Sequence, residues 1–335
     1  MASGFAAFLD DLNGYIALIL PLPLVVTNVL VLWLSIWKVK SSLSRTFTLN
    51  MSIPSLGYSL YLTIVKLLNL LKITIYFEFR TRVGDAPFLD YFTDFIYYLC
   101  TYEYRMLAIL IIFLTYLSFA RPTFYRKNFY NRNILILFAI GHLCALISSV
   151  SGCLSVNRAA LKYVLGDTYT ATTLPFSVFE ITAGCVDFFT FFILVAFYVV
   201  SVQAIIRFNY RNSQISSSAA AKKRQVKAQL FATLAYITPP SIFLIPNSFC
   251  PSFFVSFLTG DVVVMDHFCE VKIRLFSGLL LTRLFLASAM VIVAFGDYRR
   301  AILKLLEERN VLFKKTNAIK DTNTMIGMTN HRPTN

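Results

Sequence analysis

Residues 134–154 read ILILFAIGHLCALISSVSGCL, a run that contains no Asp, Glu, Lys or Arg. An α-helix rises about 1.5 Å per residue, so a run of this length can cross the ~30 Å hydrocarbon core of a lipid bilayer. A helix in the core of a soluble protein is usually shorter and keeps a charged stripe on one face. The stretch therefore predicts a membrane-spanning helix.

Six further stretches share this length and apolar character, so the sequence predicts seven membrane spans. Their bounds are residues 15–37, 47–71, 92–119, 134–154, 176–206, 228–249 and 273–295. The chain has 335 residues and is 57% hydrophobic, so the spans and short connections use nearly all of it. We therefore predict an all-α membrane protein, a seven-transmembrane helix bundle without a separate soluble domain.

Basic residues set the predicted orientation of the bundle. The connections on one side, together with the C-terminal tail, carry roughly three times as many Lys and Arg residues as the other side. Because positively charged loops stay in the cytoplasm, the N-terminus is predicted outside and the C-terminus inside. The same placement, facing anionic inner-leaflet lipid, accounts for the net charge of +14 without nucleic acid as a partner.

Four segments are expected along the chain. Residues 1–14 are a short extracellular N-terminus without the basic region of a cleaved signal peptide, so the first span acts as the insertion signal. Residues 15–297 hold the seven spans. Residues 298–315 separate apolar from charged side chains, which predicts an amphipathic eighth helix on the cytoplasmic leaflet. Residues 316–335 are polar and predicted to be disordered.

The sequence contains no pattern typical of an enzyme, a metal site or a cofactor site. His142, His267 and His331 are scattered without metal-ligand spacing, and neither a Gly-rich phosphate loop nor a nucleophile elbow is present. His142 lies alone in the fourth span, where a hydrogen-bonded packing residue is the expected role. We therefore expect no enzymatic activity, cofactor or metal ion.

Ionisable residues inside the spans are candidates for function, because a charge in the bilayer core is costly. Glu103 and Arg105 lie near the middle of the third span, Asp187 in the fifth and Arg283 in the seventh. Glu103 and Arg283 have similar depth, which predicts an ion pair between them. Two alternatives stay open: the pair only fixes helix register, or Arg105 extends into a polar cavity.

Aromatic residues crowd the outer half of the third span and continue in the fifth, which favours a pocket for a small organic ligand. Glu180 and Asp187 are seven residues apart and share a helix face that can line such a pocket. Packing against lipid is the alternative role for most of these aromatic rings. The candidate ligand-binding residues are Tyr98, Tyr102, Glu103, Arg105, Glu180, Asp187 and Arg283.

Short motifs resemble those of rhodopsin-like G-protein-coupled receptors. TNVLV at 27–31 resembles the asparagine motif of their first helix, and LNMSIPSL at 49–56 resembles the second-helix signature with Ser55 in place of its aspartate. LTY at 114–116 aligns with the Asp-Arg-Tyr motif, but Thr115 replaces the arginine that engages the G protein. ASAMV at 287–291 stands where the family has Asn-Pro-x-x-Tyr.

These departures resemble nematode serpentine chemoreceptors. RLFLAS at 283–288, followed by FGDYR at 295–299, is similar to the seventh-helix end of the serpentine class gamma superfamily. ARPTFY at 120–125 looks like the helix-three exit of its class V-type members. The resemblance implies a divergent G-protein-coupled receptor in the plasma membrane of sensory neurons, including their cilia.

From this resemblance we expect a chemosensory receptor that binds a small molecule between the outer halves of its helices and activates a heterotrimeric G protein. A seven-helix transporter or a ligand-gated channel is the alternative, although the prolines show no inverted repeat. Basic loops often reflect topology alone, so their role in coupling is a hypothesis. The residues expected to contact the G protein are Tyr116, Arg121, Lys222, Lys223 and Arg224.

Cys250 and Cys269 are the two cysteines expected in an outer connection, where the oxidising compartment permits a disulfide. If they are bridged, Cys250→Ser, Cys269→Ser and the double variant should lose the same amount of surface expression, because each breaks the same bond. Cell-surface labelling measures this loss. Additive losses in the double variant would show that the two thiols act independently.

Overall fold

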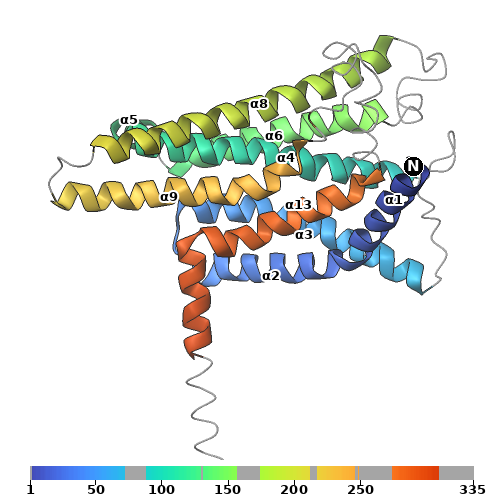
Figure 1. Cartoon of the computed structure of the whole chain (residues 1–335), viewed down its shortest axis with the longest axis horizontal. Coiled ribbons are helices and arrows are strands. Elements are labelled where there is room, and N and C mark those ends of the chain that lie inside the picture. The colour runs from blue at the N-terminus through green and yellow to red at the C-terminus, as the bar shows by residue number, and fades with distance from the viewer. Residues whose placement is uncertain are drawn as a thin grey trace, which may run out of the picture.

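The computed structural model describes residues 2–71, 88–129, 131–156, 174–211, 217–245, 248 and 274–308. Within these ranges every secondary-structure element is a helix, and the long helices run side by side (Figure 1). They are α1 (Ala2–Ile19), α2 (Pro21–Trp37), α3 (Leu43–Leu70), α4 (Phe88–Ala120), α5 (Pro122–Asn128), α6 (Asn131–Val156), α8 (Leu174–Arg211), α9 (Ser217–Ile242) and α13 (Phe276–Ala294). Residues 296–308 are also helical.

Four of these helices contain a segment long and apolar enough to cross a membrane. The segments are Tyr91–Ala120, Arg132–Ser155, Ile181–Phe208 and Ser277–Ala294. A fifth span is obtained if α1 and α2, which meet at an angle of 43°, are counted as one broken helix. The all-helical prediction is therefore confirmed for the described residues, with four or five helices suited to a bilayer. Seven spans and an outside N-terminus stay predictions.

Helices α3 and α9 are not among these candidate spans, but both belong to the bundle. Helix α3 packs against α2 and α4, and α9 packs against α4 and α13. Pro54 lies inside α3, and Pro239 and Pro240 lie inside α9. A proline inside a helix frees a backbone carbonyl, which neighbouring helices can satisfy in a membrane. The predicted spans at 47–71 and 228–249 thus correspond to bundle helices of moderate polarity.

Residues 2–14, expected to precede the first span, are helical and belong to α1. The side chain of Asn13 accepts a hydrogen bond of 2.8 Å from the backbone N–H of Gly278, in the first turn of α13. The first N–H groups of a helix lack partners within the helix, so this contact satisfies one of them. Asp10 also forms an ion pair with Arg274. The N-terminal helix is therefore attached to the start of α13.

Helix α4 occupies the centre of the bundle and packs against α3, α6, α8 and α9. Its buried side chains include Leu107, Ile111 and Leu114, which belong to the largest hydrophobic cluster. Helix α6 approaches α4 at its glycines: a methyl group on Gly152 would lie 2.7 Å from the ring of Tyr98. Small residues permit close helix packing in membranes, where apolar burial between helices drives little association.

An aromatic cluster closes one end of the bundle. Tyr236 of α9 contacts Phe47 of α3 edge-on at 5.3 Å and stacks on Phe295 at 5.4 Å between ring centroids. Tyr298, the next ring in the row, shares a hydrogen bond of 2.6 Å with Ser35 of α2. Burial raises the pKa of the Tyr298 phenol above its usual value, so this hydroxyl remains protonated.

The chain turns sharply after α13, and helix 296–308 leaves the bundle nearly across its long axis (Figure 1). Ile302 and Leu305, two residues of the predicted apolar face, pack against the main core. Leu306 is exposed, and Leu312 lies outside the described residues. The helix thus covers the first part of the predicted segment 298–315, and its place on a membrane surface stays a prediction.

We expect Gly152→Ala to lower the free energy of unfolding by about 1–3 kcal/mol, because the added methyl group overpacks the contact with the Tyr98 ring. The control is Gly57→Ala in α3, where a methyl group meets nothing within 4 Å and the higher helix propensity of alanine stabilises by up to ~1 kcal/mol. Thermal unfolding in detergent measures both. Equal melting temperatures would contradict close packing at Gly152.

Candidate functional site

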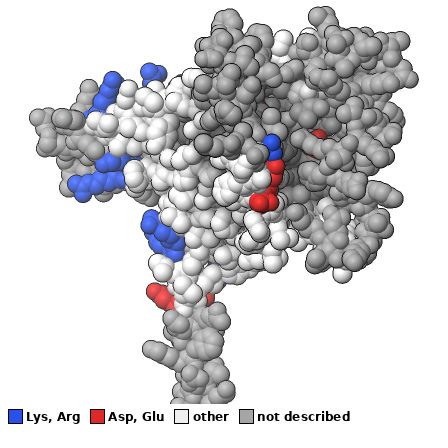
Figure 2. Space-filling view, turned by 45° about the vertical axis from the view of Figure 1, so that its right-hand side comes forward, with Lys and Arg blue, Asp and Glu red and all other residues white. Residues whose placement is uncertain are grey.

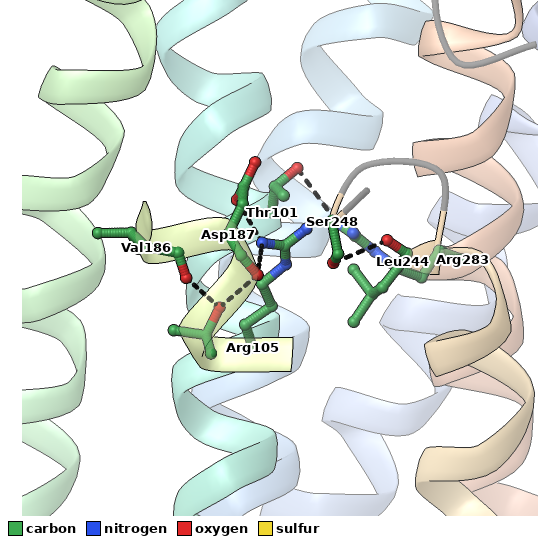
Figure 3. Close-up of polar contacts among 8 residues, drawn as sticks. Thr101, Arg105, Val186, Asp187, Leu244, Ser248 and Arg283 are labelled. Carbon is green, nitrogen blue, oxygen red and sulfur yellow. Dashed lines mark hydrogen bonds and ion pairs between the residues drawn. The ribbon is translucent and has the colours of Figure 1, made fainter. Parts of the chain in front are cut away.

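A buried ion pair connects α4 to α8 in the middle of the bundle. The Arg105 guanidinium donates from Nη1 to the Asp187 carboxylate and, at 3.4 Å, to the Asp187 backbone carbonyl. The side chains are 1% and 14% exposed. Two charges are tolerated at this depth because each offsets the cost of desolvating the other. The structure thus brings together two of the predicted ligand-binding residues (Figure 3).

Aromatic rings continue this site along the same helix. The ring of Tyr98 stacks on that of Tyr102 at 6.2 Å and 21°, and the Arg105 guanidinium lies 5.8 Å from the Tyr102 centroid. Residues three or four apart are neighbours on a helix surface, which explains the row. A cation over an aromatic face is favourable, more so away from water. These three predicted residues therefore form one continuous surface.

Arg283 enters the same region from α13. Its side chain is 1% exposed, and its Nη2 donates a hydrogen bond of 3.2 Å to the Thr101 hydroxyl. Its guanidinium lies 5.5 Å from the centroid of the Tyr104 ring. Tyr104 is one of the aromatic residues predicted to crowd the outer half of the third span, whereas Thr101 was not predicted, because an isolated threonine in a span carries no recognisable signal. They are additional residues of the site.

The predicted ion pair between Glu103 and Arg283 is not found. The Glu103 carboxylate instead lies 3.1 Å from Nδ1 of His142, whose Nε2 lies 2.8 Å from the side-chain oxygen of Asn50. Glu103 and Arg283 lie at similar depths in their spans, but two residues at the same depth can pair only if their side chains also face each other. Glu103 is two residues from Thr101, which is about 200° around a helix, so it points away from Arg283.

The Glu103 contact explains the solitary histidine of the fourth predicted span. His142 joins α6 to α4 through Glu103 and to α3 through Asn50. The interpretation of His142 as a hydrogen-bonded packing residue is therefore supported. A search for groups of three or more His, Cys, Asp and Glu side chains suited to a metal ion finds none in the described ranges.

A second polar network lies where α2, α3 and α13 meet. The Asn28 amide donates a hydrogen bond of 3.0 Å to the Ser55 hydroxyl, and the Ser288 hydroxyl donates one of 2.7 Å to the Asn28 carbonyl oxygen. All three side chains are buried. Buried polar groups need such partners, so the network fixes the mutual register of three helices.

The residues expected to contact a G protein lie apart from this buried centre. Tyr116 is half-buried near the end of α4, while Arg121 and Arg224 are exposed. Thr115 points inward and donates to the backbone carbonyl of Ile111. Figure 2 shows exposed Lys and Arg residues gathered at the end of the bundle where α5 and the start of α9 lie.

Several predicted residues fall where side chains or backbone are outside the described part of the chain. Glu180 belongs to α8, and Lys222 and Lys223 belong to α9, but only their helical backbone is described. Cys250 and Cys269 lie outside the described residues. The ligand-binding set is therefore placed for Tyr98, Tyr102, Arg105, Asp187 and Arg283, while Glu103 faces another helix.

No protein-family model matches the chain, and no curated protein is similar to it.

We expect Asp187→Asn to lower the free energy of unfolding by about 3–5 kcal/mol, because it leaves the Arg105 charge buried without a counter-ion. The matched control is Asp297→Asn, which removes an exposed pair with Arg300 and costs at most about 1 kcal/mol. Thermal unfolding in detergent compares the two. An Arg105→Gln/Asp187→Asn double variant should regain part of the loss, and a purely additive loss would argue against direct pairing.

Proposed function

We propose that this chain is a chemosensory G-protein-coupled receptor of the plasma membrane that binds a small molecule among its helices and activates a heterotrimeric G protein. In this proposal the two moderately polar helices complete a bundle of seven spans with an outside N-terminus. The spans are α1 with α2, α3, α4, α6, α8, α9 and α13. Sensory neurons and their cilia are the proposed location.

The observation that carries the proposal is the network of Asn28, Ser55 and Ser288. Asn28 and Ser55 lie in motifs that resemble the first- and second-helix signatures of rhodopsin-like receptors, and Ser288 lies in RLFLAS, which is similar to the seventh-helix end of the serpentine class gamma superfamily. Each motif alone is degenerate. The three motifs are far apart in the sequence, yet their side chains bond to one another. A set of unrelated matches would have no reason to meet at one point in the bundle.

The buried charges support a ligand site. The polar network of Asn28, Ser55 and Ser288 separates this site from the aromatic cluster. Arg105, Asp187 and Arg283 come from three helices, and ionisable groups inside a membrane mark functional sites by default. Tyr98 and Tyr102 add aromatic surface beside them. An aromatic site with few polar groups suits a small organic molecule. A transporter or channel would use the same charges to line a pathway instead.

Signalling requires a ligand that distinguishes two arrangements of the helices. The aromatic cluster of Phe47, Tyr236, Phe295 and Tyr298 ties α9 to α3 and to the chain after α13. We propose that ligand binding loosens this closed end, next to the basic residues that meet the G protein. Allosteric coupling of about 1–3 kcal/mol is typical for such a change.

The decisive experiment is nucleotide exchange on purified Gα subtypes by the full chain in lipid nanodiscs, screened with small organic molecules. A ligand should accelerate exchange. In Arg121→Ala/Arg224→Ala, which removes two exposed charges of the proposed coupling surface, the acceleration should fall several-fold while ligand-induced thermal stabilisation is kept.

A ligand that evokes current in cells lacking G proteins and never accelerates exchange would reject this function and favour the channel alternative. Acceleration that is unchanged in the double arginine variant would keep the receptor function and reject the proposed coupling surface.

A further inference from the structure

The centre of the bundle holds two guanidinium groups, of which only one pairs with a carboxylate among the described residues. Arg105 pairs with Asp187, whereas Arg283 hydrogen-bonds only the neutral hydroxyl of Thr101. Across residues 2–71, 88–156, 174–245 and 274–308, as far as they are described, no carboxylate lies within ion-pair distance of Arg283. A buried charge without a counter-ion is unfavourable, because little solvent is available to compensate it.

The two guanidinium groups are near each other. Thr101 and Arg105 are four residues apart on α4, so the hydroxyl that accepts the bond from Arg283 lies one helical turn from Arg105. Figure 3 shows both side chains directed into the same part of the core, beside Thr101. Their charges therefore combine at one place.

Hydrogen-bond donors in this place lack acceptors. In the described part of the chain, Nε and Nη2 of Arg105 and Nε of Arg283 are buried without a hydrogen-bond partner, as is Oε2 of Glu103, whose carboxylate is directed to His142. Buried donors are almost always paired, so three on two guanidinium groups need a physical explanation. A guanidinium presents its N–H groups as a planar fork that matches the two oxygens of a carboxylate.

From these observations we propose that Arg105, Arg283 and Thr101 form an anion-binding site, and that the ligand of this protein is a small organic acid. The ligand carboxylate accepts hydrogen bonds from Arg283 and from the unpaired N–H groups of Arg105. On this side of α4, two guanidinium groups and the Asp187 carboxylate leave one positive charge, which a single carboxylate neutralises, because the Glu103 carboxylate is directed to His142 on the other side of the helix. A phosphate dianion would leave an excess of negative charge, so a carboxylate fits better.

The surroundings favour an organic acid over a simple inorganic anion. The Arg105 guanidinium lies 5.8 Å from the centroid of the Tyr102 ring, and the Arg283 guanidinium lies 5.5 Å from that of Tyr104. Tyr98 extends the aromatic surface by stacking on Tyr102. Such rings can contact the apolar body of an organic molecule, whereas chloride has no apolar part for them to contact. The identity of the ligand class rests on the receptor function proposed above, whereas the anion site itself does not.

The test measures thermal unfolding of the full chain in nanodiscs without a G protein. The probes are sodium benzoate, phenylacetate and hexanoate, each against its primary amide and against sodium chloride at equal ionic strength. A ligand that binds only the folded chain raises the melting temperature, so the acids should raise it by several degrees and the amides should not. Arg283→Gln should abolish the shift, and Arg283→Lys should keep only part of it.

A second pair of variants decides the case if none of the three acids is a good ligand. Thr101→Glu places a carboxylate beside Arg283 and one turn from Arg105, so it should raise the melting temperature of the unliganded chain. Thr101→Gln, which has the same shape without the charge, should not. Thr101→Glu should also remove any response to the acids, because its own carboxylate occupies the site.

Three results would overturn the anion site: equal shifts with acids and amides, an undiminished acid shift in Arg283→Gln, or no stabilisation by Thr101→Glu relative to Thr101→Gln. A shift with chloride as large as with the acids would reject the organic acid as ligand. An acid shift without accelerated nucleotide exchange on any Gα would reject the receptor function and keep the anion site. Nucleotide exchange that is accelerated by a neutral ligand, and that is unaffected in Arg283→Gln, would keep the receptor function and reject the anion site as its ligand site.

Discussion

The ion pair between Arg105 and Asp187 is the interaction on which the arrangement of the bundle depends. Arg105 lies near the midpoint of the span Tyr91–Ala120, where a charge has no water to solvate it. Its partner comes from α8, so α4 and α8 keep this charge paired only in one relative register. Helix α4 also packs against α3, α6 and α9, so that register passes to most of the bundle.

The same constraint explains why the polar residues of the spans form networks rather than isolated contacts. Glu103, His142 and Asn50 connect three helices on one side of α4, and Asn28, Ser55 and Ser288 connect three helices deeper in the bundle. Without water, each such group depends on side chains from neighbouring helices. Among the described residues, the network around Arg283 leaves donors of both arginines without partners, and Oε2 of Glu103 is also unpaired.

The sequence predicted the helices well because length and apolarity are properties of a segment by itself. It identified Arg105, Asp187 and Arg283 for the same reason, since a charge within an apolar run is visible without any knowledge of packing. The partners were not predictable. The direction of Glu103 around α4 depends on helix rotation, and Thr101 became important only because Arg283 reaches it from α13. Residues 15–37 were predicted as one helix, whereas the structure has a bend before Pro21 and a helix that extends back to Ala2.

The attachment of α1 to α13 has a practical consequence. Asn13 holds the first turn of α13 through Gly278, which lies little more than one helical turn from Arg283. A tag fused to the N-terminus would therefore extend a packed helix that supports the helix carrying Arg283. Affinity measured on an N-terminally tagged chain would include any strain that the tag transmits through α1. Helix 296–308 leaves the bundle at the opposite end, and its last residues, 306–308, are exposed, so they offer the safer side for a purification or fluorescence label.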